Sequence, residues 1–180
     1  MALTAISGHS ADGPKNGIVL LIRHAEKPND GAGLSLDGQK RAQAYPKYFQ
    51  DFTIDGKPLK LSAIFAAADS DSSVRPRLTV EPLAKTLGLR VNDDFKTKDL
   101  RDLAKALKNL PAGETVLVCW RHGEIPELLH ELGAKPKELL ADGDWPEHVY
   151  DWVIQLRYDR KGNLLGAKRI NEHLMPSDNE

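Results

Sequence analysis

Cysteine is nearly absent from this chain: Cys119 is the only one among 180 residues. A single cysteine excludes an internal disulfide, and its place in the apolar run 116–120 predicts a buried, unreactive thiol. The chain also lacks a basic excess, because 25 Lys and Arg stand against 26 Asp and Glu. This balance argues against a general binder of nucleic acids or of membrane surfaces.

Long apolar segments are missing as well. No stretch approaches the roughly 20 apolar residues that a membrane span requires. Residues 1–16 have no basic start and no long apolar segment, so as written they are not a signal peptide. We expect them to form a flexible arm. A cytoplasmic location is the default expectation, and export after removal of a natural signal peptide stays open.

The composition of the chain is that of an ordinary soluble domain, with 41% apolar and 28% charged residues. At this length a single core buries roughly 70% of the surface of the unfolded chain, so stability requires neither metal nor disulfide. The sequence shows no internal repeat, no linker and no clear cluster of metal ligands. We therefore predict one domain over 17–176, without a cofactor and of unspecified oligomeric state.

Short apolar runs alternate with helical patterns along the chain. Buried strands are predicted at the apolar runs 18–22, 63–67 and 115–120. Helices are predicted at 36–52 after the N-cap Ser35, with Pro46 as a kink or interruption, and at 75–87, 100–110 and 126–133. The segments 149–158 and 164–170 predict a β-hairpin. The fold class expected is α/β, with helices on both faces of a mostly parallel sheet that ends in an antiparallel pair.

An Arg-His pair follows each of two predicted strands, as Arg23-His24 and as Arg121-His122. Ligands of open α/β sheets bind beyond the carboxyl ends of the strands, so both histidines face one rim if the strands are parallel neighbours. Guanidinium groups beside them suit an oxyanion, because they offer forked donors and stay charged. The alternative is that each histidine only ends its strand and has no role in binding. The presence of two matched Arg-His pairs argues against this alternative.

At these residues the chain resembles the histidine phosphatase superfamily, which contains phosphoglycerate mutases and histidine acid phosphatases. The motifs that carry the resemblance occur in family order, at 23–28 (Arg-His-Ala-Glu-Lys-Pro), 34–42 (Leu-Ser-x-x-Gly-x-x-x-Ala), 75–79 (Arg four residues before Thr) and 116–123 (apolar strand, then His-Gly). They span about 18–133. The resemblance implies a three-layer α/β/α sandwich of the phosphoglycerate mutase type.

The resemblance also implies roles for individual residues. His24 would attack phosphorus as a neutral ring and carry a phosphohistidine. Arg23, Arg75 and a protonated His122 would hold the non-bridging oxygens, so that no metal is needed. Arg75 is favoured over Arg77 by its spacing to the threonine of the motif.

The proton donor to the leaving oxygen is less well defined by the sequence. Glu124 lies two residues after the second histidine, as in the acid phosphatases, and is favoured as general acid and then general base. The alternatives are Asp99 or Asp102, near the place where mutase-like members carry a glutamate. A further possibility is that Glu124 only favours the start of the next helix.

Some positions depart from the family pattern or stay open. Arg121 replaces a small residue and is either a fourth phosphate contact or a surface charge. Glu26 and Lys27 either line the pocket or form an exposed ion pair of little value. The aromatic residues of the C-terminal region are expected in the core more than in a substrate pocket, namely Trp145, Tyr150 and Trp152.

The predicted function is that of a metal-independent phosphoric monoester hydrolase acting on a phosphorylated small molecule or a phosphoprotein, with no nucleic-acid or membrane partner. Three alternatives remain. The first is a mutase, which needs a second phosphate clamp and lid insertions that the short loops leave little room for. The second is a phosphohistidine phosphatase acting on a protein, and the third is a non-catalytic module that binds phosphoryl ligands.

Overall fold

The first apolar run of the chain lies in the middle of the sheet. The structure is a computed structural model that describes residues 12–179. In it β1 (Ile18–Arg23) pairs in parallel with β6 (Thr115–Trp120) and antiparallel with β7 (Trp152–Tyr158). β1 is therefore flanked on both edges, and the two Arg-His pairs follow strands that are parallel neighbours.

Six strands form this sheet, in the order β5-β4-β6-β1-β7-β8. The remaining members are β4 (Ala63–Ala66), β5 (Val91–Asn92) and β8 (Leu164–Asn171). The first four strands run parallel, and β7 runs antiparallel to both of its neighbours. The predicted fold class, a mostly parallel sheet completed by an antiparallel C-terminal hairpin, is confirmed.

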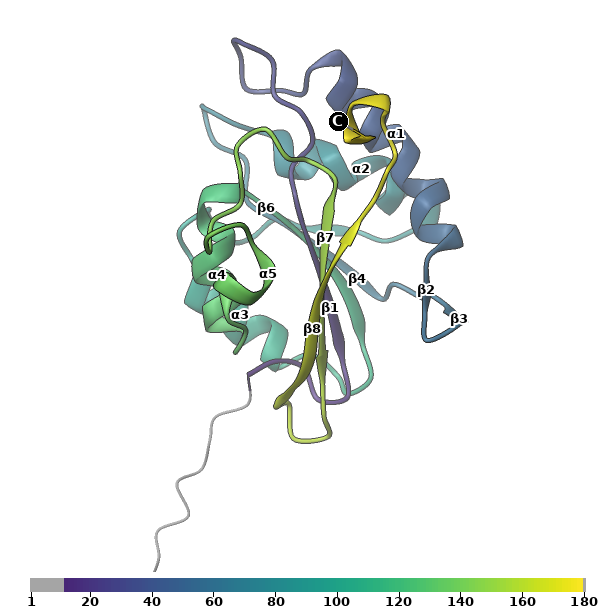
Figure 1. The fold of residues 1–180 in the computed structure, drawn as a ribbon, viewed down its shortest axis with the longest axis vertical. Helices are drawn as coiled ribbons and strands as arrows, with labels where there is room; N and C mark the ends of the chain where they lie inside the picture. The colour runs from purple at the N-terminus through teal and green to yellow at the C-terminus, as the bar shows by residue number, and fades with distance from the viewer. Residues whose placement is uncertain (1–11, 180) are drawn as a thin grey trace, which may run out of the picture.

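Helices cover both faces of the sheet (Figure 1). On one face lie α1 (Leu36–Asp51) and α2 (Arg75–Leu87), and on the other lie α3 (Leu100–Lys108), α4 (Ile125–Glu131) and α5 (Pro136–Leu139). Along β1 the side chains alternate between the two cores, with Val19 and Leu21 in one and Leu20 and Ile22 in the other. This burial on both faces explains why the strand is continuously apolar.

The ends of the long helices follow the signals read from the sequence. Ser35 caps α1, and its hydroxyl accepts a hydrogen bond from the amide of Gly38. Pro46 lies inside α1, which nonetheless continues to Asp51. α2 ends at Gly88, whose φ of 65° is the left-handed conformation that glycine adopts readily.

Several short elements escaped the sequence analysis. They are β5, α5, the two-stranded hairpin of β2 (Thr53–Ile54) and β3 (Lys57–Pro58), and the 3-10 turns η1 (His122–Glu124) and η2 (Pro176–Asn179). Elements of two to four residues are too short to show a helical or alternating pattern. β7 begins at residue 152, whereas the sequence predicted a start at 149. Val149 instead lies in a turn, in which its amide donates to the carbonyl of Pro146 and its own carbonyl accepts from Arg23.

Hydrogen bonds join both ends of the described chain to the rest of the molecule. The part of the expected flexible arm that the structure describes is bonded to the β7–β8 turn: the amides of Asp12 and Gly13 donate to the carbonyl of Gly162, and Asn16 donates to that of Asp159. At the other end the ordered chain continues beyond residue 176, through η2, because Asp178 is bonded to a buried arginine. Residues 1–11 lie outside the described residues.

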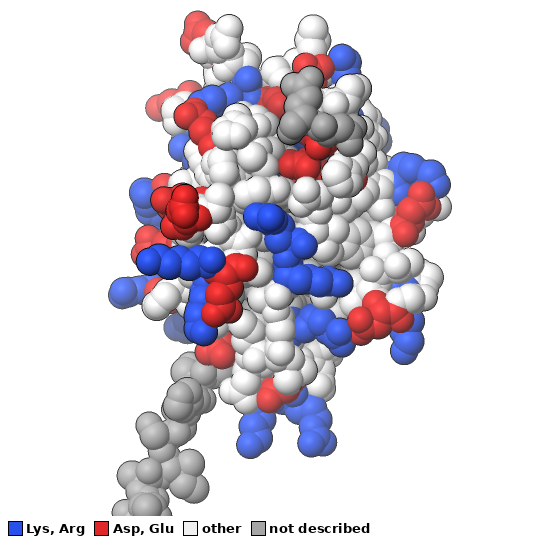
Figure 2. All heavy atoms as spheres, viewed as in Figure 1, with Lys and Arg blue, Asp and Glu red and all other residues white. Residues whose placement is uncertain are grey.

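The surface over β7 and β8 carries many charged side chains. Figure 2 shows Lys and Arg gathered over the middle of this face, with acidic groups beside them. Along the edge strand β8, Lys168 and Arg169 are exposed, which discourages pairing of this edge with another chain. Within residues 12–179, no helix has the length and the apolar character needed to cross a membrane.

Candidate active site

The two Arg-His pairs meet at one end of the sheet. The amide of His24 donates to the carbonyl of Trp120, the last residue of β6, over 3.0 Å. The rings of His24 and His122 face each other edge to face, with their centroids 6.4 Å apart. This is a separation across which both rings can contact one tetrahedral anion, as the sequence analysis required.

His24 is a buried, neutral imidazole. Its ring Nδ1 lies 2.7 Å from the carbonyl oxygen of Ala25, and this acceptor requires Nδ1 to carry the proton. The pKa of His24 is lowered to about 3, first by burial and then by the charges of Arg23 and Arg75. Nε2 therefore keeps a free lone pair at any working pH, which is the state that a nucleophile needs.

Arg23 is completely buried and held in place by main-chain oxygens. Its Nη1 donates to the carbonyls of Pro146, Glu147 and Val149 at 3.2, 2.7 and 2.8 Å. The guanidinium stacks 3.8 Å above the ring of Tyr150, a cation–π contact, and burial lowers its pKa to about 10. Its Nε is buried and has no hydrogen-bond partner.

His122 differs from its expected protonation state. Nη2 of Arg23 lies 3.2 Å from Nδ1 of His122, and an arginine can only donate. Nδ1 must accept, so the ring is the neutral tautomer with the proton on Nε2. Burial and the charge of Arg23 lower the pKa of His122, which favours the neutral ring over the expected imidazolium. The neutral ring still offers one N–H donor.

Arg75 approaches the site from the first turn of α2. Its Nη1 donates to the carbonyl of Gly31 at 3.0 Å, and its Nη2 to that of Ser72 at 3.4 Å. Arg77, the competing arginine, instead pairs with Asp69 and Glu81. The charge of Arg75 lowers the pKa of His24, so Arg75 lies close enough to act on this ring electrostatically.

Thr79 connects α2 to the turn that carries His24. Its buried hydroxyl accepts from the amide of Ala25 at 2.9 Å and donates to the carbonyl of Arg75 at 2.8 Å. The threonine of the family motif thus has a physical role. It sets the distance between the helix that presents Arg75 and the peptide that holds the His24 ring.

Gly38 allows the start of α1 to pack against the same turn. A Cβ at this position would lie 2.4 Å from the carbonyl oxygen of Glu26, so a side chain cannot fit. The amide of Ser35 donates to that same oxygen at 2.9 Å. The Leu-Ser-x-x-Gly motif therefore fixes the backbone two residues beyond His24.

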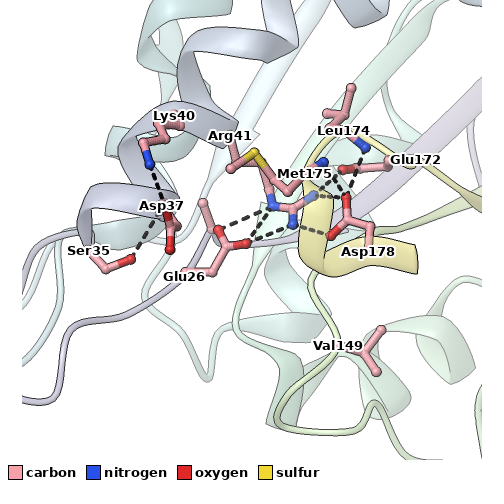
Figure 3. Close-up of polar contacts among 12 residues, drawn as sticks. Glu26, Ser35, Asp37, Lys40, Arg41, Val149, Glu172, Leu174, Met175 and Asp178 are labelled. Atoms are coloured by element: carbon pink, nitrogen blue, oxygen red, sulfur yellow. Dashed lines mark hydrogen bonds and ion pairs between the residues drawn. The ribbon is translucent and has the colours of Figure 1, made fainter. Parts of the chain in front are cut away.

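The Glu26 side chain is engaged by Arg41 of α1, which is fully buried (Figure 3). Nη2 of Arg41 donates to Glu26 at 2.7 Å and to Asp178 at 2.6 Å, and its Nη1 donates to Glu172 at 3.2 Å. Sequence analysis missed this cluster, because its members lie up to 152 positions apart. It ties the turn after His24 to the C-terminal segment.

One guanidinium cannot neutralise three carboxylates. Glu172 is the most deeply buried of them and also receives a hydrogen bond from the hydroxyl of Tyr45. Burial raises the pKa of Glu172 to about 8, so this carboxyl is protonated in the folded protein at neutral pH.

Glu26 and Lys27 do not form the exposed ion pair that the sequence left open. Glu26 is bonded to Arg41, whereas Lys27 pairs with Glu147, whose side chain is two-thirds exposed. Glu147 raises the pKa of His122 and Lys27 lowers it, so both side chains lie near this ring. The carbonyl of Glu147 also holds Arg23.

The structure does not bring the candidate proton donors into contact with the histidines. Glu124 lies in η1, directly after His122, and its carboxylate accepts from Lys98 at 2.7 Å with 15% of the side chain exposed. Asp99 accepts from the amide of Lys96, and Asp102 lies in the first turn of α3. Of these three carboxylates, Glu124 is the one whose charge acts on His122.

The aromatic residues and the cysteine divide between core and site. Trp145 and Trp152 are buried in the core, as expected, whereas Tyr150 lies under Arg23 and 6.4 Å from the His24 ring. Cys119 is buried, and burial raises the pKa of its thiol, which agrees with an unreactive group. For Tyr150 the expectation of a core position is therefore wrong, because its ring packs against Arg23 beside His24.

Residues 12–179 contain no group of three or more His, Cys, Asp or Glu side chains placed to hold a metal ion. A groove of about 710 Å³ lies between α1 and α2, beside the exposed Leu36. Its lining includes none of the predicted site residues.

Comparisons with known proteins were made by sequence and by structure. No family model matches the chain, and no curated protein matches it in sequence. The protein histidine phosphatase SixA, solved with tungstate, matches with a TM-score of 0.60 at 16% identity over 86% of this chain and 97% of its own. Phosphoglycerate mutase from Plasmodium falciparum matches with a TM-score of 0.54 at 19% identity, over 84% of this chain and 88% of its own.

A second phosphoglycerate mutase, from Bacillus anthracis, matches with a TM-score of 0.54 at 10% identity and covers 94% of this chain and 99% of its own. At these identities the comparisons establish the fold. The described residues share the fold of SixA and of the phosphoglycerate mutases, as the resemblance in sequence implied.

Proposed function

We propose that this protein hydrolyses phosphate monoesters through a phosphohistidine on His24. The observation that carries the proposal is the state of this ring: Nδ1 is bonded to the Ala25 carbonyl, and Nε2 is free and unprotonated beside Arg23, Arg75 and His122. A neutral nucleophile surrounded by donors suits attack on a dianionic phosphoryl group. The fold shared with SixA, titled a protein histidine phosphatase, supports the same reaction class.

In the first step Nε2 of His24 attacks phosphorus in line. The new N–P bond forms as the P–O bond to the alcohol breaks, and the leaving oxygen takes a proton from a general acid. In the second step water attacks phosphorus, its proton goes to the same group, and the N–P bond breaks to release phosphate. The histidine returns to its starting state, so the cycle needs no other reactant.

The positive groups of the site stabilise charge on the transferred phosphoryl oxygens. Arg23 contributes the positive charge of its guanidinium, and His122 offers the N–H of Nε2, which its bond from Arg23 leaves as the protonated nitrogen. Arg75 adds a second guanidinium. Because both Arg23 and His122 are held by other groups before substrate binds, little reorganisation is needed, which is the main source of such catalysis.

We propose Glu124 as the general acid and base. It follows His122 by two residues, is shielded from solvent for most of its side chain, and acts on His122 electrostatically. Glu147 is the competing carboxylate. Both carboxylates accept from a lysine and act on His122, but the side chain of Glu147 is largely exposed whereas that of Glu124 is not. Lys27 and His122 also lower the pKa of Glu147, so it is less suited to donate a proton at neutral pH.

The decisive experiment is a rapid-quench measurement with p-nitrophenyl phosphate. The wild-type protein should give a burst of nitrophenol together with one phosphoryl group on His24, found by mass spectrometry of the peptide. His24→Ala should give neither, while still binding phosphate. Equal background hydrolysis by both proteins, with phosphate binding retained, would instead establish a non-catalytic phosphoryl-binding module.

A phosphoprotein is the second candidate substrate, because SixA is matched over 97% of its length and is titled a protein histidine phosphatase. Dephosphorylation of a phosphohistidine-containing protein should be compared with that of p-nitrophenyl phosphate under the same conditions. A far larger kcat/KM for the protein would identify a phosphohistidine phosphatase. Formation of a phosphate isomer, rather than free phosphate, would identify a mutase.

A further inference from the structure

Arg41 of α1 binds the residue that follows Ala25 in the turn after His24. Its Nε donates to both carboxylate oxygens of Glu26, at 3.0 and 3.2 Å, and its Nη2 donates to one of them at 2.7 Å. Two donors on two oxygens fix a carboxylate in orientation as well as in position. The side chain of Glu26 is therefore fixed to α1 by a contact that the proposed reaction does not use.

The position of Glu26 determines where the Ala25 carbonyl points. One planar peptide unit joins this carbonyl to the amide and the Cα of Glu26. The same carbonyl accepts the proton of His24 Nδ1 at 2.7 Å. The carbonyl of Glu26 accepts from the amide of Ser35, so the main chain and the side chain of Glu26 are both bonded to the start of α1. A shift of Glu26 would therefore move the acceptor that orients the imidazole.

The C-terminal segment contacts the other side of the same guanidinium. Nη1 and Nη2 of Arg41 donate to the two carboxylate oxygens of Asp178, at 3.0 and 2.6 Å. Oδ2 of Asp178 also accepts from the amides of Leu174 and Met175, at 2.9 and 2.8 Å, so this carboxylate closes the turn in which it lies. Figure 3 shows the guanidinium of Arg41 between Glu26 and Asp178. The end of the chain is thereby joined to the turn after His24.

The Arg41 cluster is buried, which bears on its role. The side chains of Arg41, Glu172 and Asp178 are almost completely buried, and that of Glu26 is largely so. Desolvation of buried charges offsets most of their mutual attraction, so apolar side chains of similar volume would stabilise the fold as well. Hydrogen bonds from a guanidinium differ from apolar contacts in that they fix direction. The feature that this cluster supplies is therefore a defined orientation of the groups that it joins.

We infer that Arg41 is a positioning residue that acts through Glu26 on the ring of His24. Asp178 acts one step further away, because it holds the guanidinium of Arg41 from the opposite side. The C-terminal segment thereby keeps the Ala25 carbonyl on Nδ1 of His24, which leaves Nε2 as the nucleophile. This inference rests on the proposed function and specifies how its nucleophile is controlled.

The first test observes the proton of His24 by NMR and does not depend on turnover. In protein labelled with 15N at histidine, the wild-type ring should show a protonated Nδ1 and an unprotonated Nε2, with His24→Ala identifying its signals. Arg41→Lys keeps the charge but loses the fork, and Asp178→Asn keeps the shape but loses the charge. Both variants should shift His24 toward a mixture of the two tautomers, Arg41→Lys the more strongly.

The second test measures kcat and KM with p-nitrophenyl phosphate. Arg41→Lys should lower kcat about tenfold and Asp178→Asn less, with KM little changed, because the nucleophile is misaligned while the groups that bind phosphate are untouched. Tyr158→Phe is the matched control for lost stability. Its buried hydroxyl donates to the carbonyl of Leu132, at the end of the sheet where β1 begins. This variant should lower the urea midpoint but leave kcat and the His24 spectrum unchanged.

Two results would overturn the inference. One is a wild-type spectrum of His24 in both variants. The other is a kcat that is unchanged in Arg41→Lys, or that falls no further than in Tyr158→Phe, since lost stability would then account for it. Should Arg41→Lys not fold, Asp178→Asn decides both tests. A wild-type protein without hydrolytic activity, in which these variants still change the His24 tautomer, would refute the hydrolase and leave the positioning role intact.

Discussion

The hydroxyl of Thr79 accepts a hydrogen bond from the amide of Ala25 over 2.9 Å, across a separation of 54 residues. The same Ala25 peptide, through its carbonyl, receives the proton of His24 Nδ1. A single residue of the turn thus carries both the contact that orients the imidazole and the contact that anchors the turn to α2. Thr79 is therefore a positioning residue that acts through Ala25.

Removal of the Thr79 hydroxyl should impair catalysis more than binding. Thr79→Val preserves the shape of the side chain but leaves the buried Ala25 amide without an acceptor, which costs about 1–3 kcal/mol of stability. We expect kcat to fall roughly tenfold with KM little changed, because the turn loses its anchor. Thr79→Ser should restore most of kcat, whereas a purely structural role would lower stability in Thr79→Val without changing kcat.

His122 should be tolerant of a neutral replacement that keeps a donor. His122→Ala is expected to lower kcat by about 10²–10³, the usual effect of losing a donor to the transition state. His122→Gln presents an amide N–H near the former Nε2 and should recover part of the loss. If activity instead requires an imidazolium, Gln will be no better than Ala, and kcat of the wild-type protein will fall steeply above the pKa of that ring.

The role of Glu124 can be tested by comparing the hydrolysis rates of substrates whose leaving groups differ in their need for a proton. Glu124→Gln should slow hydrolysis of an alkyl phosphate by about 10²-fold or more, but that of p-nitrophenyl phosphate much less, because nitrophenolate leaves without a proton. Glu147→Gln is the matched comparison. A selective effect on alkyl phosphates in Glu147→Gln, and not in Glu124→Gln, would transfer the role to Glu147.

Glu172 should make stability depend on pH above the acidic range. Its pKa is about 8 in the folded protein and near 4.5 when exposed, so the folded state holds a proton that the unfolded state releases. This contribution to stability is complete below pH 4.5 and is lost as the pH rises to about 8. Glu172→Gln removes the titration, so its stability relative to wild type should rise by roughly 3–5 kcal/mol across this interval.

Urea unfolding at several pH values measures this difference, with the exposed Glu127→Gln as control. Other groups titrate in the same range: His24, whose pKa is lowered by folding, destabilises the protein as the pH falls below about 6.5. Comparison of each variant with wild type at the same pH cancels that effect. A constant difference from pH 5 to pH 9 would contradict the buried, protonated carboxyl.

The parts of the molecule that could be predicted from sequence are those with a periodic or local signal. The strands that lead to Arg23 and Trp120 are continuous apolar runs, Ser35 and Gly88 mark helix ends, and the two Arg-His pairs follow from their strands. Short elements such as β5 have too few residues for a pattern and depend on pairing with β4.

The remainder of the site arises from contacts that leave no trace in a local pattern. Arg23 is held by three backbone carbonyls of the 146–149 segment, and any residue supplies a carbonyl. The protonation state of His122 depends on a donor from a residue 99 positions away. The family motifs indicated which residues gather at the site, but not how their protons are distributed.

The bonds of Arg41 bear on where this protein can be shortened or fused. Two of its three carboxylate partners, Glu172 and Asp178, follow the last strand, which ends at Asn171. Truncation of the chain after Asn171 would leave the buried Arg41 guanidinium with Glu26 as its one remaining carboxylate partner. The loss of partners from a buried charge costs about 3–5 kcal/mol of stability. Purification handles at this end therefore belong on a spacer beyond residue 180, and a library of C-terminal deletions should show a sharp fall in soluble yield once Asp178 is removed.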